Sequence, residues 1–259
     1  MSSPYSAKAS KGKEEPEAYI IGWQPFIGLK IYLDSKPLIP RTETEWWTEQ
    51  LISNLCDDGM STRRESHSAS AREEAIFQQK NTPLSSRGLP SEQLRFLDLC
   101  AGSGAIGCAM LARLPNAKVY FGEIDPAHEV TILKNIRENN LDESRADIRV
   151  GDLFEPFSNM KFDVIAINPP YIPAERELPA SVADYEPTIA LRSGADGLDL
   201  IRRIALELPK HLSGDGEMWL ECDSPSAETA SGLFTAQGFS AEIRTDQYDR
   251  PRIIVVSFK

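Results

Sequence analysis

The sequence holds few of the residues that build metal centres or disulfide frameworks. Its 4 cysteines are scattered without a Cys-x-x-Cys pair, and none of its 3 histidines lies close to one along the chain. We therefore expect no metal site, and we expect reduced thiols in an intracellular protein. The cytoplasm and the mitochondrion both stay open, because residues 1–13 have the lysines of a presequence and no acid, but also no arginine.

Long apolar runs and positive charge are also scarce. With 41% hydrophobic residues the chain can form a core, but no apolar run approaches the roughly 20 residues that span a bilayer, so no membrane contact is expected. The net charge is −11, from 28 basic and 39 acidic residues. Binding to a phosphate backbone needs a basic surface, so direct contact with nucleic acid is disfavoured, and a monomer with a protein or small-molecule partner is expected.

Four segments of the chain differ in composition. Residues 1–18 are rich in Ser, Lys and Glu, which predicts a disordered tail. Residues 19–56 predict a short hairpin and an amphipathic helix at 43–55, with capping-box spacing from Thr42 to Glu45. Residues 57–93 are polar and predict a flexible insertion, whereas residues 94–259 alternate between strand and helix patterns.

This alternation predicts an α/β fold with a mostly parallel sheet and helices on both faces. Seven strands are expected at 95–99, 118–122, 147–150, 162–167, 216–221, 240–245 and 252–258. Helices are expected at 105–113, 127–140, 197–211 and 226–237. The hairpin and first helix would form a small N-terminal extension of this sheet.

A glycine-containing loop follows the first of these strands. Its residues lead straight into the next helix: Cys100, Ala101, Gly102, Ser103 and Gly104. Glycines let the backbone come close to a ligand, and the free N–H groups of a helix start favour a carboxylate. Because Gly107 extends the pattern to Gly-x-Gly-x-x-Gly, the loop alone leaves both a nicotinamide dinucleotide and S-adenosylmethionine open.

Acidic residues at successive strand ends help to decide between these two cofactors. They lie where a doubly wound sheet binds its ligand. We expect Glu123 to bind a ribose, with Asp125 as the second candidate, and Asp98 to face a cationic amino-acid end. Asp152, beside Leu153, would accept from an adenine amino group. A sulfonium tolerates acidic walls better than a pyrophosphate does, which favours S-adenosylmethionine and a class I, Rossmann-like methyltransferase fold.

The fourth strand leads into Asn168, Pro169, Pro170 and Tyr171. The prolines restrict the backbone, so that the Asn168 side chain and the Pro169 carbonyl can form a fixed pair of acceptors for an NH₂ group. We expect the Tyr171 ring to cover one face of a planar substrate, with its hydroxyl incidental. Asn168 is also expected to border the cofactor. The loop predicts transfer of a methyl group to a conjugated nitrogen, with catalysis resting on the positioning of that nitrogen and no strong base required.

Four segments together carry a resemblance to one family. They are the cofactor loop at 97–104, the Asn-Pro-Pro-Tyr loop, Leu38-Ile39-Pro40-Arg41 with Thr44-Glu45, and Tyr185-Glu186-Pro187 with Ala190-Leu191. The last two are similar to the signatures L-I-P-R-x-x-T-E and F-E-P-x-x-A-L. On these residues the chain resembles the HemK/PrmC family of protein-glutamine N5-methyltransferases, and Cys100 is similar to its eukaryotic, particularly fungal, members.

The resemblance implies a function and a substrate. The cofactor would be S-adenosylmethionine, and the substrate the glutamine in the Gly-Gly-Gln loop of a peptide-chain release factor. Two departures stand out: fewer than 20 residues precede the predicted hairpin, where the family usually carries a helical bundle, and Cys222-Asp223 follow Leu220-Glu221 where the family tends toward L-E-x-G.

Two other functions stay open. An adenine-N6 methyltransferase acting on DNA or RNA is the alternative, because an adenine amine offers the same NH₂ geometry. A non-catalytic scaffold is the third, and the intact Asn-Pro-Pro-Tyr loop argues against it.

Overall fold

The computed structural model describes residues 15–57 and 93–259. Residues 1–14 and 58–92 hold most of the expected tail and insertion, and these two expectations lie outside the described residues. Within the described ranges, no helix combines the length and the apolar character that crossing a membrane requires. The same ranges contain no group of three or more His, Cys, Asp or Glu side chains placed to hold a metal ion.

The N-terminal part forms a small layer against the main sheet. It consists of α1 (Glu17–Ile21), β1 (Trp23–Phe26), β2 (Leu29–Tyr32) and α2 (Thr42–Asp57). The strands β1 and β2 pair antiparallel as a hairpin. Glu17 and Ala18, which were expected to belong to the tail, lie in α1. Gly22, in the left-handed region with φ 86°, ends this short helix and turns the chain into β1.

The main sheet has seven strands in the order β5-β4-β3-β6-β7-β9-β8. They are β3 (Leu94–Leu99), β4 (Ala117–Glu123), β5 (Ala146–Val150), β6 (Phe162–Ile167), β7 (Leu212–Glu221), β8 (Phe239–Thr245) and β9 (Pro251–Phe258). All neighbours are parallel except β9, which runs antiparallel to both β7 and β8. The predicted mostly parallel seven-stranded sheet is confirmed, and each expected strand overlaps an observed one.

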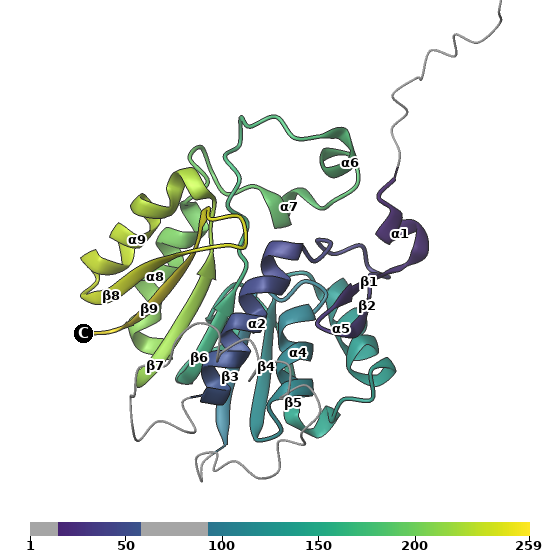
Figure 1. The fold of residues 1–259 in the computed structure, drawn as a ribbon, viewed down its shortest axis with the longest axis horizontal. Coiled ribbons are helices and arrows are strands. Elements are labelled where there is room, and N and C mark those ends of the chain that lie inside the picture. Colours follow the sequence, from purple (N-terminus) through teal and green to yellow (C-terminus); the bar gives the residue numbers. More distant parts are fainter. Residues whose placement is uncertain (1–14, 58–92) are drawn as a thin grey trace, which may run out of the picture.

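Helices cover both faces of the sheet (Figure 1). On one face α4 (Ala105–Arg113) and α5 (Pro126–Glu138) share a hydrophobic core with α2 and the hairpin. On the other face α8 (Asp199–His211) and α9 (Ala227–Ala236) share a second core. Shorter elements are α6 (Ala180–Ala183), α7 (Thr188–Leu191) and the 3-10 turns Glu143–Arg145, Glu155–Phe157 and Ser224–Ser226.

The third glycine of the Gly-x-Gly-x-x-Gly pattern serves packing. A Cβ atom on Gly107 would lie 2.2 Å from Cε1 of Phe121, so only glycine lets α4 lie this close to β4. This explains the dinucleotide-like spacing without a dinucleotide, because close helix–strand packing is the usual reason for that glycine.

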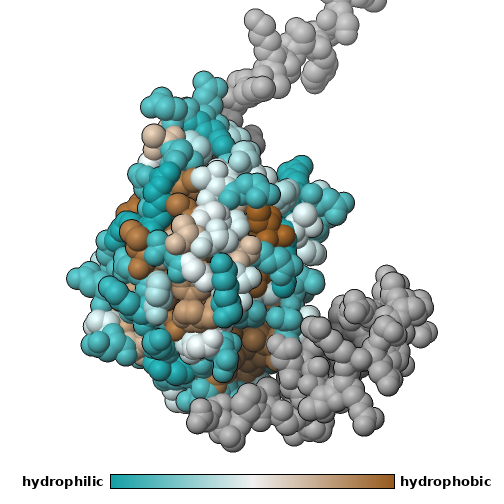
Figure 2. Space-filling model, turned by 90° about the vertical axis from the view of Figure 1, so that its left-hand side faces the viewer, coloured by the Kyte–Doolittle hydropathy of each residue, from teal (hydrophilic) through white to brown (hydrophobic). Residues whose placement is uncertain are grey.

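The order of the strands indicates where on the sheet a ligand site is expected. The chain moves outward from β3 to β4 and β5 on one side, and from β6 to β7 on the other, so the connections diverge between β3 and β6. A crevice forms at the carboxyl ends of the strands where connections diverge in this way. The segment with α6 and α7 lies above this edge (Figure 1). On the face shown in Figure 2, hydrophilic side chains lie mostly around the margin, and apolar ones form groups nearer the middle.

Candidate active site

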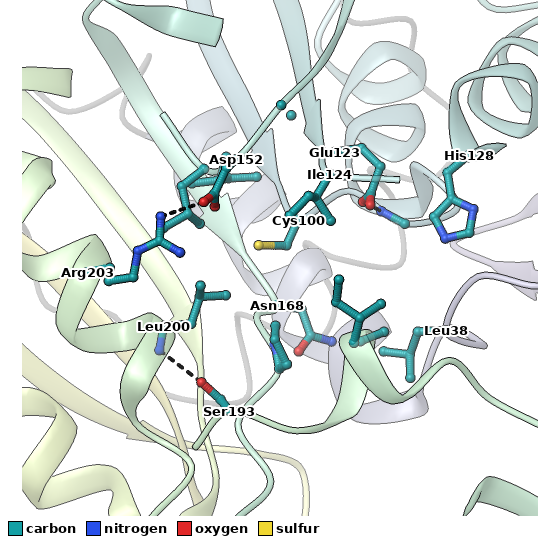
Figure 3. A pocket seen from close by; sticks show the side chains of 18 of the residues that line it. Leu38, Cys100, Glu123, Ile124, His128, Asp152, Asn168, Ser193, Leu200 and Arg203 are labelled. Atoms are coloured by element: carbon teal, nitrogen blue, oxygen red, sulfur yellow. Dashed lines mark hydrogen bonds and ion pairs between the residues drawn. The ribbon is translucent and has the colours of Figure 1, made fainter. Parts of the chain in front are cut away.

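A cavity of about 320 Å³ opens at the carboxyl ends of the central strands. It is lined by six of the residues predicted to bind the cofactor, namely Cys100, Gly102, Glu123, Asp152, Leu153 and Asn168. Figure 3 shows Cys100, Glu123, Asp152 and Asn168 arranged around the same space. Residues that the sequence reasoning missed complete the wall, among them Leu38, Ile124, His128, Arg192 and Arg203.

The loop between β3 and α4 has the strained backbone of a ligand-binding turn. Cys100, Gly102 and Gly104 have φ values of 61°, 54° and 75°, in the left-handed region. Such a conformation in a residue other than glycine costs on the order of 1 kcal/mol, and it is concentrated at functional sites. A backbone bond from Ala101 N to Gly122 O, 3.0 Å long, holds the loop against β4.

A second, smaller cavity of about 40 Å³ adjoins the loop. Ala101 and Ser103 line it together with Thr44 and Asn168. Cys100, Gly102 and Asn168 line both cavities, so the predicted cofactor loop and the Asn-Pro-Pro-Tyr loop border the same region, with Thr44 of α2 at the smaller cavity.

The Glu123 side chain links the end of β4 to the loop that follows β3. Its side chain is buried, with Oε2 accepting from Gly102 N at 2.7 Å and Oε1 from Asp125 N at 2.9 Å. A carboxylate oxygen has a second lone pair, so both atoms can still accept from a ligand. Asp125 is used differently, because its Oδ1 accepts from Ala127 N at 2.8 Å and caps α5, and it does not line the cavity. Of the two candidates for the ribose, only Glu123 faces the cavity.

Asp98 lies beneath the loop and not in the cavity wall. Its side chain is buried, Oδ2 accepts from Gly107 N at 2.8 Å, and Oδ1 has no hydrogen-bond partner among the described residues. Burial raises the pKa of this carboxyl well above its usual range, and the nearby Glu123 adds to the rise. The expected contact of Asp98 with a cationic ligand end stays a prediction; in this geometry the side chain turns inward and accepts from Gly107 at the start of α4.

Asp152 and Leu153 line the larger cavity just after the end of β5. Asp152 Oδ2 accepts from Nη2 of Arg203 at 2.8 Å, an ion pair between the end of β5 and α8. Leu153 is buried and has φ 49°, a second strained residue at this edge. Cys100 also lines the wall, and burial followed by the charge of Glu123 raises the pKa of its thiol far above its usual range. This environment favours the protonated thiol, which can pack against a ligand.

The side-chain amide nitrogen of Asn168 forms a hydrogen bond with α2. Nδ2 donates to Thr44 Oγ1 at 3.1 Å, and the residue lines both cavities. Pro169 is buried behind it and Pro170 lines the larger cavity. The structure thus places Asn168 between the predicted cofactor loop and the open space, where an amide oxygen could meet a substrate.

Tyr171 does not have the expected role in the wall. It is absent from the residues that line either cavity, and its hydroxyl donates to Glu221 Oε1 at 2.9 Å. Burial, then the charge of Glu221, raises the pKa of this phenol well above its usual value. The expectation that the hydroxyl is incidental stays a prediction, and the hydrogen bond to a buried carboxylate argues against it.

The sequence reasoning missed Glu221. Its side chain is buried and accepts from Thr44 Oγ1 at 2.7 Å and Trp47 Nε1 at 2.8 Å, in addition to Tyr171. The signal was available, because Glu221 ends β7 at the same sheet edge at which Glu123 ends β4. What it contacts could not be seen, since Thr44 is 177 residues away in the chain.

Comparisons with known proteins agree with this geometry. The family model described as "Methyltransferase small domain" matches residues 81–183. A "Release factor glutamine methyltransferase" of Geobacter sulfurreducens is 34% identical over 89% of this chain and 69% of the relative. Another of that name, from Chlamydia trachomatis serovar L2, is 32% identical over 93% of this chain and 72% of the relative.

A solved structure supports the fold alone. The hMettl16 catalytic domain, in complex with MAT2A 3′UTR hairpin 6, has a TM-score of 0.54 and 18% identity. The match covers 90% of this chain and 77% of that one. The two relatives described above are bacterial, so the expected likeness to fungal proteins stays a prediction.

Proposed function

This chain belongs to the release factor glutamine methyltransferase family, and we propose that it methylates the side-chain nitrogen of glutamine in the Gly-Gly-Gln loop of a release factor. It is an S-adenosylmethionine-dependent methyltransferase. The observation that carries the proposed chemistry is the orientation of Asn168, whose nitrogen is bound to Thr44 and whose oxygen is therefore free to accept.

The cavity suits S-adenosylmethionine in shape and charge. Its backbone comes close to the ligand space at Gly102, where a side chain would be strained. Glu123 supplies negative charge at one strand end, and Asp152, paired with Arg203, offers carboxylate oxygens as acceptors at another. We assign the ribose to Glu123 and the adenine amino group to Asp152, with Cys100 and Leu153 packing against the cofactor. When bound, the cofactor supplies an electrophilic methyl group on a cationic sulfonium, which these acidic walls tolerate.

The substrate side follows from the chemistry of an amide. A glutamine nitrogen is a poor nucleophile because its lone pair is delocalised into the carbonyl group. Asn168 Oδ1 and the Pro169 carbonyl can accept its two N–H groups and hold the nitrogen in line with the methyl group. Formation of the N–C bond would break the S–C bond of the bound cofactor, whose electron pair would stay on the sulfur, and the nitrogen would lose one proton to water. Positioning and exclusion of water supply the acceleration, so a strong base is not required.

A transfer assay tests this proposal against an adenine substrate, which offers the same NH₂ geometry. The purified protein is incubated with methyl-labelled S-adenosylmethionine and, separately, a release factor, a Gly-Gly-Gln peptide and an adenine-containing oligonucleotide. We expect label in the release factor, weaker labelling of the peptide, and none in the oligonucleotide. Label in the oligonucleotide alone would refute the glutamine assignment while leaving the cofactor assignment intact.

A further inference from the structure

A chain of hydrogen bonds connects Glu221 to Asn168 through Thr44. Glu221 Oε2 accepts from Thr44 Oγ1 at 2.7 Å, and Thr44 Oγ1 accepts from Asn168 Nδ2 at 3.1 Å. Trp47 Nε1 donates to the same Oε2 at 2.8 Å. Glu221 and Thr44 are 1% and 3% exposed, so water cannot substitute for a missing partner in this chain.

The direction of every bond in this chain is determined. An indole N–H can only donate, so the contact with Trp47 makes Glu221 Oε2 an acceptor. The Thr44 hydroxyl has one hydrogen, and it must point to that same oxygen. Thr44 Oγ1 then has only lone pairs left for Asn168.

This leaves one favourable orientation for the Asn168 amide. With Nδ2 toward Thr44, an N–H meets a lone pair, and Oδ1 is directed away from Thr44 as an acceptor. If the amide rotated by half a turn, two oxygens with lone pairs would face one another, and Asn168 would present N–H groups to the substrate N–H groups. A buried polar contact of that kind is strongly disfavoured.

We propose that Glu221 and Thr44 are positioning residues that set the polarity of the Asn168 amide. Neither residue needs to touch the substrate. They keep the acceptor side of the amide turned toward an NH₂ group and thereby select a substrate nitrogen that carries hydrogens. This inference rests on the proposed function, since it assigns to Asn168 the task of accepting from the substrate.

The test removes one hydroxyl. Thr44→Val keeps the shape of the side chain, and Glu221 keeps Trp47 and Tyr171 as donors, so the protein should fold. Because valine offers no lone pair to accept from Asn168 Nδ2, the Asn168 amide can take either orientation. We expect kcat on the Gly-Gly-Gln substrate to fall about 10-fold or more, with S-adenosylmethionine affinity within about 3-fold of the wild type. Thr44→Ser keeps the hydroxyl and should recover most of the turnover that Thr44→Val loses.

A matched control is available on the same helix. Thr48 is fully buried, and its hydroxyl donates to the backbone oxygen of Thr44 at 2.7 Å, within α2. Thr48→Val therefore removes an equally buried hydroxyl that has no contact with Asn168 among the described residues. We expect the melting temperature to change in both valine variants, but kcat only in Thr44→Val. An equal fall of kcat in both would show a general loss of packing and overturn the proposal.

A double-mutant cycle separates positioning from a direct role. In an Asn168→Ala background, Thr44→Val should produce no further fall in kcat, because no amide remains to be oriented. If the two effects multiplied, Thr44 would act independently of Asn168 and the inference would be wrong. Failure of the proposed function has a different signature, since the wild type itself would then not label glutamine.

Discussion

Arg41 and Glu186 form an ion pair between segments that are 145 residues apart. Nη2 of Arg41 lies 2.6 Å from Oε1 and 2.7 Å from Oε2 of Glu186, whose side chain is 1% exposed. Each residue belongs to one of the two signature segments that flank the site in the sequence. The pair joins the stretch before α2 to the segment of α6 and α7 that lies above the cavity.

Removing the cation should loosen this segment. Arg41→Met leaves the Glu186 carboxylate buried without a partner, which we expect to lower the free energy of unfolding by about 1–3 kcal/mol and to raise KM for the protein substrate more than it lowers kcat. Adding Glu186→Met should restore part of the stability, because no charge is then left unpaired. Urea unfolding and steady-state kinetics check both effects, and additive losses in the double variant would contradict the pairing.

Glu123 and Asp125 offer a matched pair of variants. Glu123→Ala removes an acceptor that faces the cavity, and we expect S-adenosylmethionine binding to weaken by about 1–3 kcal/mol. Asp125→Ala removes the cap of α5 and should cost about 1 kcal/mol of stability while leaving cofactor affinity nearly unchanged. Calorimetric titration measures the effect of each variant on cofactor binding, and thermal unfolding measures its effect on stability. The assignment fails if Asp125→Ala weakens cofactor binding more than Glu123→Ala does.

The elements of the main sheet could be predicted because their signals are local. The helix Ala105–Arg113 and the strand Phe162–Ile167 have the bounds expected from apolar pattern and glycine position. Strand ends placed Glu123 and Asp152 correctly at the cavity, since parallel strands bring their carboxyl ends to one edge. Such features depend on residues that are close in sequence.

Directions of side chains could not be predicted in the same way. Asp98 and Glu123 both lie at strand ends, yet one turns inward to Gly107 and the other lines the cavity. The Tyr171 hydroxyl and Thr44 meet at Glu221 only after the chain has folded, because each contact spans 50 residues or more. The sequence pattern does not predict short helices such as α7, since four residues carry too little periodicity to be recognised.

The contact of Tyr171 with Glu221 changes what Tyr171→Phe should do. The substitution leaves one buried carboxylate oxygen without its donor, so we expect a loss of stability of about 1–3 kcal/mol and a measurable fall in kcat. The retained ring should keep the loop folded. Melting temperatures and turnover numbers for the variant and the wild type provide the check, and values indistinguishable from the wild type would show that the hydroxyl is dispensable after all.

Asp98 predicts a dependence of stability on pH. Its folded-state pKa lies above the ordinary value of 3.8, so protonation favours the folded chain. The stabilisation from this group is fully present below pH 3.8 and is lost as pH rises through the folded-state pKa. Asp98→Asn does not titrate and keeps an oxygen for Gly107 N, so its stability relative to the wild type should grow as pH rises and then level off. Urea unfolding at several pH values measures this difference, and a difference that is constant or shrinks with pH would contradict the burial argument.

The position of the transferred methyl group tests the account most directly. A release factor is incubated with S-adenosylmethionine and either the wild-type protein or Asn168→Ala, digested, and sequenced by tandem mass spectrometry. The account predicts one added methyl group on the side-chain nitrogen of the glutamine in Gly-Gly-Gln, with the Asn168→Ala reaction slower by about 100-fold or more at saturating cofactor. A methyl group on any other residue, or equal methylation by Asn168→Ala, would contradict it.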